Sequence, residues 1–194
     1  MKRALGYTGI TLALGIGCSK SERPIESGRS YTSVTYTDTT RETFARTDRA
    51  ITGVVIAGGD SVRFRIHTAP DDLVSMVDFT LHPASSRDDK PHTRRIGMPQ
   101  NTLPIMGTSV AFLEQLLRRA RAIGGDSVSI PIMMVGAQAS LDVFTVIRNG
   151  PDSLVLVGPD GNWTNAIHLA LDSAGRVRGG TIPLSGTRIT AITP

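Results

Sequence analysis

The sequence has few of the residues that mark a disulfide-stabilised or catalytic protein. Cys18 is the only cysteine among 194 residues, so the chain can form no disulfide within itself. Aromatic residues make up 5% of the chain, and Trp163 belongs to no aromatic series that could stack on bases or sugars. No Gly-x-Ser-x-Gly motif occurs, which removes the commonest hydrolase signature. These absences favour a non-enzymatic protein without a cofactor.

Concentrated positive charge is also missing. The formal net charge is +4, and it falls to +2 if Lys2 and Arg3 are removed with a signal peptide. Most arginines stand singly, and the cluster at 118, 119 and 121 is explained as the solvated face of a helix. Phosphate binding by a nucleic-acid-binding protein needs a concentrated basic face, so the sequence argues against nucleic acid as a partner.

The first 20 residues have the pattern of an export signal. Two basic residues precede a mostly apolar run from Ala4 to Ile16, and polarity rises sharply after Cys18. The run is too short for a comfortable membrane span. We therefore expect residues 1–17 to be a signal peptide, residues 18–30 to be a flexible polar tether, and residues 31–194 to form a single domain.

The end of the signal resembles the lipobox of bacterial lipoproteins, in which a cysteine after a small residue becomes the lipidated first residue of the mature protein. Gly17 precedes Cys18 as in that pattern, whereas Gly15 replaces the usual bulky aliphatic residue and Leu14 lies one position too early. The resemblance implies an acyl anchor on Cys18, and Ser19 implies delivery to the periplasmic side of the outer membrane. An ordinary secretory signal and an uncleaved anchor are the alternatives.

One stretch of the mature chain has the period of an amphipathic helix. Ser109 is expected to cap its start, Glu114 to pair with Arg118, and Gly124 to end it. Apolar residues recur every three or four positions at Val110, Leu113, Leu116, Leu117, Ala120 and Ile123. This spacing predicts a helix over 109–123 with one buried face.

Most of the remaining chain predicts short strands. Val62, Phe64 and Ile66 alternate with polar residues, and turn signals recur about every 8 to 12 residues after the helix. By contrast, 82–107 contains four prolines and little periodicity apart from a short strand expected at 93–96, which is typical of a lid or a binding loop. The predicted fold is mainly β, an antiparallel sheet of about 10–12 short strands curved into a half-barrel or open barrel around one amphipathic helix.

Two candidate catalytic or metal-binding patterns are better explained as structure. Gly-Asp-Ser-Val at 59–62 and 125–128 superficially resembles an esterase motif, but each serine opens a predicted strand and Asn165 stands three residues before His168. These strings therefore predict turns. A loop that contains His82, Asp88, Asp89 and His92 matches no compact ligand spacing, so it predicts a solvated loop rather than a metal site.

Methionines on both sides of the helix indicate a ligand cavity. The four methionines could lie together with two helix residues in a cavity that adapts to an apolar ligand, or they could fill an irregular core. The set is Met98, Met106, Phe112, Leu116, Met133 and Met134.

The order of elements is similar in layout to periplasmic lipoprotein carriers with an open β half-barrel, and to β-rich lipoprotein domains of unknown function. The sequence thus predicts a membrane-tethered, extracytoplasmic lipoprotein that binds an apolar small molecule or lipid between sheet and helix. The alternatives are an assembly lipoprotein that binds a protein partner and an accessory domain of a secreted hydrolase.

Overall fold

The computed structural model describes residues 24–84, 90–135 and 139–192. These residues contain one α-helix, α1 (Val110–Ile123), and two short 3-10 helices, η1 (Trp163–Asn165) and η2 (Pro183–Ser185). The strands are β1 (Pro24–Val34), β2 (Thr39–Thr47), β3 (Ala50–Ala57), β4 (Asp60–Thr68), β5 (Val74–His82), β6 (His92–Gly97), β7 (Leu103–Ile105), β8 (Ser127–Met134), β9 (Ser140–Arg148), β10 (Ser153–Val157), β11 (Ile167–Leu171), β12 (Val177–Ile182) and β13 (Thr187–Ile192).

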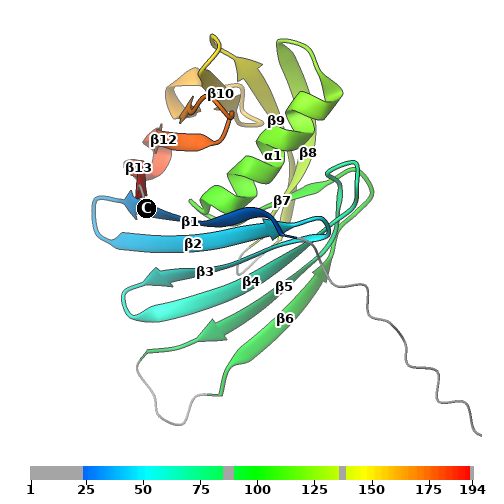
Figure 1. The fold of residues 1–194 in the computed structure, drawn as a ribbon. Helices are drawn as coiled ribbons and strands as arrows, with labels where there is room; N and C mark the ends of the chain where they lie inside the picture. Colours follow the sequence, from blue (N-terminus) through cyan, green and yellow to red (C-terminus); the bar gives the residue numbers. More distant parts are fainter. Residues whose placement is uncertain (1–23, 85–89, 136–138, 193–194) are drawn as a thin grey trace, which may run out of the picture.

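All of these strands belong to one 13-stranded sheet in the order β6-β5-β4-β3-β2-β1-β13-β12-β11-β10-β9-β8-β7. Neighbouring strands pair antiparallel, except that β7 and β8 are parallel. Strands β1 to β6 form one meander, β8 to β13 form a second, and the β1–β13 pair joins them. The two meanders curve toward the helix (Figure 1). The edge strands of the described sheet are β6 and β7, each paired on one side only. The architecture is therefore an open half-barrel.

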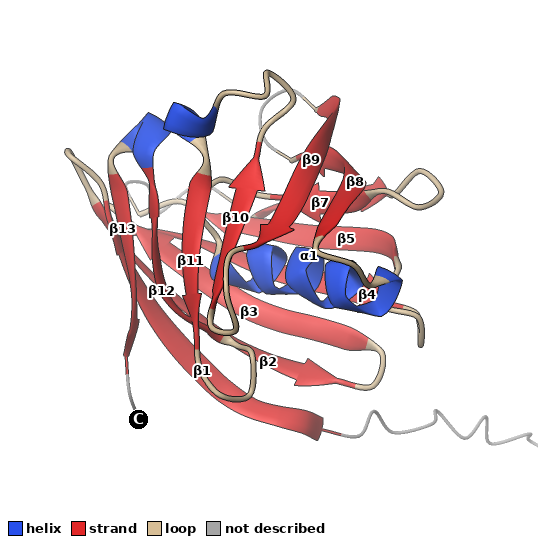
Figure 2. Ribbon diagram, turned by 90° about the horizontal axis from the view of Figure 1, so that it is seen from above, coloured by secondary structure: helices blue, strands red, loops and turns tan. Residues whose placement is uncertain are grey.

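Helix α1 lies in the hollow of the curved sheet (Figure 2). Phe112 is fully buried, and its ring centroid lies 5.3 Å from that of Phe64 and 6.1 Å from that of Phe79. The predicted apolar face is buried from Val110 to Ala120, whereas Ile123 at the end of the helix is 51% exposed. Burial of this face against both meanders supplies much of the core.

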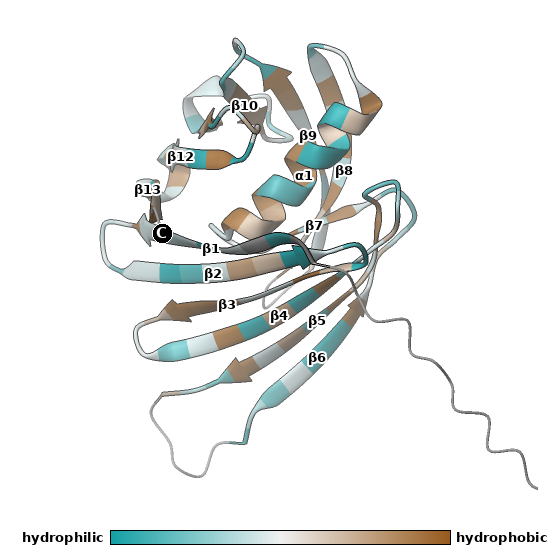
Figure 3. Ribbon diagram, viewed as in Figure 1, coloured by the Kyte–Doolittle hydropathy of each residue, from teal (hydrophilic) through white to brown (hydrophobic). Residues whose placement is uncertain are grey.

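The strands alternate between the core and solvent as the sequence predicts. In β4, Phe64 and Ile66 are buried while Arg63 is exposed, and this alternation is visible along β4 in Figure 3. Gly53 on β3 makes the close packing of this region possible. A Cβ atom at Gly53 would lie 2.5 Å from Phe64 and 2.7 Å from both Phe44 and the carbonyl oxygen of Thr43. Phe44 on β2 and Phe64 on β4, the strands on either side of β3, therefore pack over a position that has no side chain.

The start of α1 is capped by a side chain from the sheet. The carboxylate of Glu42 on β2 accepts hydrogen bonds from the backbone N–H groups of Val110 (2.6 Å) and Ala111 (3.2 Å). It also accepts one from the Ser109 hydroxyl, at 2.6 Å. The expectation that the Ser109 side chain caps the helix is wrong, because that hydroxyl is held by Glu42. A buried carboxylate thus satisfies the positive end of the helix dipole.

A second buried carboxylate, Glu114, ties the middle of α1 to the sheet. It accepts hydrogen bonds from Arg29 (2.7 Å), the Tyr31 hydroxyl (3.1 Å) and the backbone N–H of Val177 (3.0 Å). The expected pair between Glu114 and Arg118 is wrong, because Arg118 pairs with Glu26 on β1. The Glu114 side chain is 4% exposed and the Arg118 side chain is 25% exposed, and each finds its ion-pair partner on β1.

The structure confirms the predicted fold class and corrects several boundaries. The predicted tether 18–30 is wrong at its end, because residues 24–30 form the first part of β1 and pair with β2. The short strand expected at 93–96 is confirmed as part of β6, and the segment 82–107 also contains β7, which the sequence did not predict. Residues Trp163–Asn165 form η1, and the next strand begins at Ile167.

Candidate functional site

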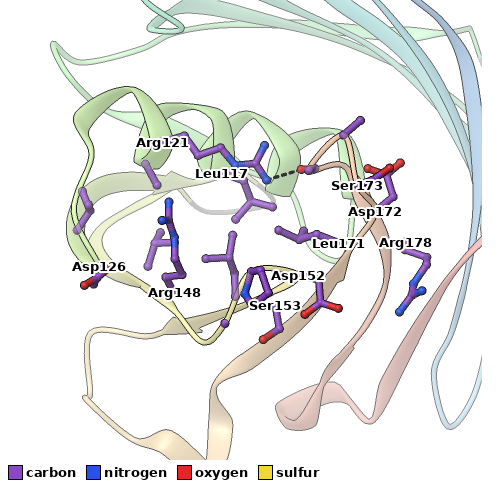
Figure 4. Close-up of a pocket in the computed structure, with 18 of the residues that line it drawn as sticks. Leu117, Arg121, Asp126, Arg148, Asp152, Ser153, Leu171, Asp172, Ser173 and Arg178 are labelled. Atoms are coloured by element: carbon purple, nitrogen blue, oxygen red, sulfur yellow. Dashed lines mark hydrogen bonds between the residues drawn. The ribbon is translucent and has the colours of Figure 1, made fainter.

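A cavity of about 890 Å³ lies between the C-terminal half of α1 and the ends of strands β8 to β12. Three loops surround it, at 124–126 before β8, at 149–152 between β9 and β10, and at 172–175 between β11 and β12. Figure 4 shows side chains from these loops and from α1 around the same space. The volume falls within the roughly 300–1,000 Å³ typical of small-molecule sites.

The inner wall of the cavity is apolar. Two of its residues come from α1, and the rest come from β8, β9, β10 and β11. They are Leu117, Ala120, Val128, Val146, Leu154 and Leu171, and all six are buried. An aliphatic group placed there would be removed from water.

The rim of the cavity is charged. Its cations are Arg121, Arg148 and Arg178, and its anions are Asp126, Asp152 and Asp172. Asp172 is already paired, because its carboxylate lies 2.7 Å from the Arg176 Nε and also accepts the Arg176 backbone N–H. Burial acts to raise the pKa of Asp172, but the hydrogen bonds and charge of Arg176 outweigh it and lower the pKa.

Two rim arginines are without partners in the described part of the chain. The guanidinium groups of Arg148 and Arg178 make no hydrogen bond or ion pair there, although Arg148 closes the end of β9 through its backbone. In Figure 4, Arg148 points from β9 toward α1, on the side of Arg121, whereas Arg178 lies beyond Asp152. The rim therefore holds one arginine directed toward the helix and another directed elsewhere.

Arg121 is held in place by the loop opposite it. Its guanidinium donates to the carbonyl oxygen of Gly175, and a Cβ atom at Gly175 would lie 2.7 Å from the Arg121 Nη1. Gly175 also has a positive φ of 74°, which disfavours other residues. Burial lowers the pKa of Arg121, and the positive charges of Arg118 and Arg148 lower it further, against the opposing effect of Glu114 and Asp172. This guanidinium is thus crowded by like charge.

A smaller cavity of about 140 Å³ adjoins the first and shares Leu117, Arg121, Ala174 and Gly175 with it. Its other walls include Glu26 of β1 and the Arg118 that pairs with it. Burial acts to raise the pKa of Glu26, but hydrogen bonding and the nearby arginines lower it, so the carboxyl group stays ionised. The beginning of β1 therefore lies beside the cavity.

The methionine site predicted from the sequence lies elsewhere in the fold. Phe112 and Leu116 are fully buried, and the four methionines are partly buried residues packed against the same core. None of the set Met98, Met106, Phe112, Leu116, Met133 and Met134 lines either cavity described above. Cys18, the predicted lipid-attachment site, lies outside the described residues.

The cavity-lining residues were missed because no motif joins them. They come from α1, five strands and three loops that are far apart in the sequence. One signal was available, since Gly125, Gly150 and Gly175 all occupy turns that the sequence predicts, and those turns fall at one end of the sheet. The turns that lie at the same end of the sheet can be identified only when the order and direction of the strands in the two meanders are known.

Neither a metal cluster nor a membrane-spanning helix is found among the residues that the structure describes. No group of three or more His, Cys, Asp or Glu residues lies together in these ranges. Of the loop considered for metal, His82 and His92 end β5 and begin β6, while Asp88 and Asp89 lie outside the described residues. No helix in the described ranges is long and apolar enough to cross a membrane.

The fold and site define a class: an open, mainly β half-barrel that holds one helix and leaves a cavity at the end of that helix. The same fold occurs in the crystal structure of a DUF1089 family protein from Pseudomonas aeruginosa. The similarity has a TM-score of 0.51 at 12% sequence identity, and it covers 91% of this chain and 95% of that one. No family model and no curated protein matches the sequence. At this identity the likeness concerns the fold alone.

Proposed function

We propose that the protein is a membrane-tethered, extracytoplasmic lipoprotein that binds an apolar ligand, such as a lipid chain, between its sheet and its helix. The observation that carries the proposal is the cavity of about 890 Å³ with a buried apolar wall. We therefore place the proposed ligand site at the C-terminal end of α1, and not among the methionines expected from the sequence. No chemical reaction is assigned to the cavity.

The first strand links the cavity to the proposed anchor. β1 starts at Pro24, and Glu26 lines the small cavity that adjoins the main one. Pro24 is six positions beyond Cys18 in the sequence, and a fully extended chain of six residues spans at most about 20 Å. An acyl anchor on Cys18 would therefore keep the cavity close to the bilayer surface, where lipids are available.

Ligand binding is tested by filling the cavity. Ala174, an exposed residue that lines both cavities, is changed to Phe, and Ala120 on the helix is changed to Phe in a second variant. The matched control is Ala84→Phe, an exposed position outside both cavities. The affinity for a fluorescent fatty-acid probe is expected to fall about tenfold in the first two variants and to stay unchanged in the control.

Two outcomes would count against ligand binding. One is a probe affinity that is the same in Ala174→Phe, Ala120→Phe and the unchanged protein. The other is native mass spectrometry that detects no added lipid on the folded protein at any concentration below its solubility limit. Circular dichroism of each variant shows whether it is folded, and Ala174→Phe is the decisive variant because it changes an exposed loop.

The anchor is tested separately by labelling. Cells that express the full chain are grown with a fatty-acid analogue, and the protein is expected to take up the label at Cys18. Cys18→Ser is expected to lose the label and to leave the membrane fraction, whereas Ser19→Ala is expected to keep both. A mature protein that carries an unmodified Cys18 by mass spectrometry would contradict the anchor and leave ligand binding untouched.

A further inference from the structure

The charged rim carries information on the ligand beyond its apolar part. Arg121 and Arg148 approach the same space from α1 and from the end of β9 (Figure 4). They are coupled, since the charge of Arg148 acts to lower the pKa of Arg121. Two guanidinium groups directed into one site repel each other, and an anion between them would remove that repulsion.

Among the described residues, no carboxylate forms an ion pair with Arg121 or Arg148. Asp172 is engaged by Arg176, and Glu26 is engaged by Arg118 and Arg29. Glu114 faces inward to Arg29, Tyr31 and Val177. The carboxylates of Asp126 and Asp152 form no ion pair within the described ranges, and Figure 4 shows Asp152 on the side of Arg178. Within the described ranges, the Arg121 guanidinium is bonded only to the carbonyl oxygen of Gly175, and the Arg148 guanidinium has no hydrogen-bond or ion-pair partner.

The position of the pair relative to the apolar wall defines the shape of the ligand. Arg121 is one residue beyond Ala120 and one helical turn beyond Leu117, both of which belong to the wall. Arg148 is two residues beyond Val146, which also belongs to it. A molecule with its chain on the wall would bring its head to the two guanidinium groups. Planar guanidinium groups bind carboxylate and phosphate oxygens through paired hydrogen bonds.

We propose that the cavity selects amphiphiles with an anionic oxygen head group, a carboxylate or a phosphate, which Arg121 and Arg148 bind while the aliphatic chain lies on the apolar wall. This inference rests on the proposed ligand-binding function and makes it specific. Arg148 is the stronger determinant, because its guanidinium has no other partner among the described residues, whereas Arg121 already donates to Gly175.

The test compares ligands of equal chain length on the full protein. Dodecanoate, dodecyl phosphate, dodecanol and inorganic phosphate are titrated by calorimetry below the micelle concentration. The two anionic amphiphiles are expected to bind at least about tenfold more tightly than dodecanol, and the preference is expected to fall as salt is raised. Arg148→Met, which keeps an unbranched side chain, is expected to reduce binding of the anions about tenfold and to leave dodecanol unchanged.

The control is Arg188→Met, an exposed arginine on β13 that lines neither cavity, and it is expected to change nothing. Equal binding of dodecanoate and dodecanol would overturn the inference while leaving the proposed function intact. So would an Arg148→Met variant that weakens all ligands alike. If inorganic phosphate binds as tightly as dodecyl phosphate, the cavity is a site for free anions, and the inference that it selects amphiphiles is overturned. If none of the amphiphiles binds, the proposed function itself fails.

Discussion

Replacing Glu114 by Gln should be among the most damaging near-isosteric changes in this protein. Its carboxylate accepts from Arg29 (2.7 Å), from the Tyr31 hydroxyl (3.1 Å) and from the backbone N–H of Val177 (3.0 Å), and it is 4% exposed. Burial raises the pKa of Tyr31, and the Glu114 charge raises it further, so the phenol stays a donor. Glutamine offers a single oxygen and turns an N–H group toward other donors.

The size of the effect follows from the donors left without an acceptor. Breaking a buried ion pair by removing one partner costs about 3–5 kcal/mol. Arg29 is 15% exposed and keeps its bond to Glu26, so we expect the lower part of this range, about 3 kcal/mol. Near the midpoint, this lowers the Tm by roughly 6–12 °C for a chain of this size. Urea unfolding should show a lower midpoint with an unchanged slope, which reports stability rather than compactness.

The matched control is Arg95→Met, which breaks an ion pair to Asp78 from a side chain that is 68% exposed. Because this ion pair is exposed to solvent, its loss should change the urea midpoint little. The double variant Arg29→Met/Glu114→Leu replaces both charges with apolar groups and should recover part of the loss. A Glu114→Gln protein that unfolds at the same urea concentration as Arg95→Met would refute the reasoning.

Three further predictions concern the core and the helix cap. Phe112→Ala should cost about 3–5 kcal/mol in thermal unfolding because the ring is fully buried against Phe64 and Phe79, whereas Trp163→Ala, 58% exposed, should cost less than about 1 kcal/mol. Gly53→Ala should destabilise by about 1–3 kcal/mol in urea, and Gly97→Ala, whose Cβ would meet nothing within 4 Å, should have a smaller effect; equal losses would contradict the close packing. Burial raises the pKa of Glu42 above its ordinary 4.5 despite the hydrogen bonds from Ser109, Val110 and Ala111. The contribution of Glu42 to stability is therefore fully present below the unfolded pKa and is lost as pH rises through the folded pKa. The free energy of unfolding of the unchanged protein, relative to that of Glu42→Gln, should fall from pH 4 to pH 8. A relative stability that rises with pH would contradict the raised pKa.

The parts of the fold that depend on local pattern could be predicted from the sequence. The three-and-four spacing from Val110 to Ala120 predicts the buried helical face, because those side chains share one side of a helix. The alternation around Phe64 predicts a strand with one buried face. Glycine turns between strands predict an antiparallel meander, and the sheet has that form except at β7.

The parts that depend on distant partners could not be predicted. Glu42 caps a helix whose first residue is 68 positions further along the chain, and no local signal marks such a cap. Residues 24–30 are too polar to suggest a buried strand, yet β2 supplies backbone partners and Glu114 on the helix supplies one for Arg29. The cavity is harder still, because its wall is a space left between elements rather than a property of any one of them.

The seam between β1 and β13 places the two ends of the domain side by side in the middle of the sheet. The first strand has its full set of neighbours only after the last strand has been synthesised. Contacts of such long sequence separation form late and slow folding, because a large loop must close before they contribute. Loss of β13 at the C-terminus would therefore split the sheet into two meanders, each with a newly exposed edge that can pair with another chain.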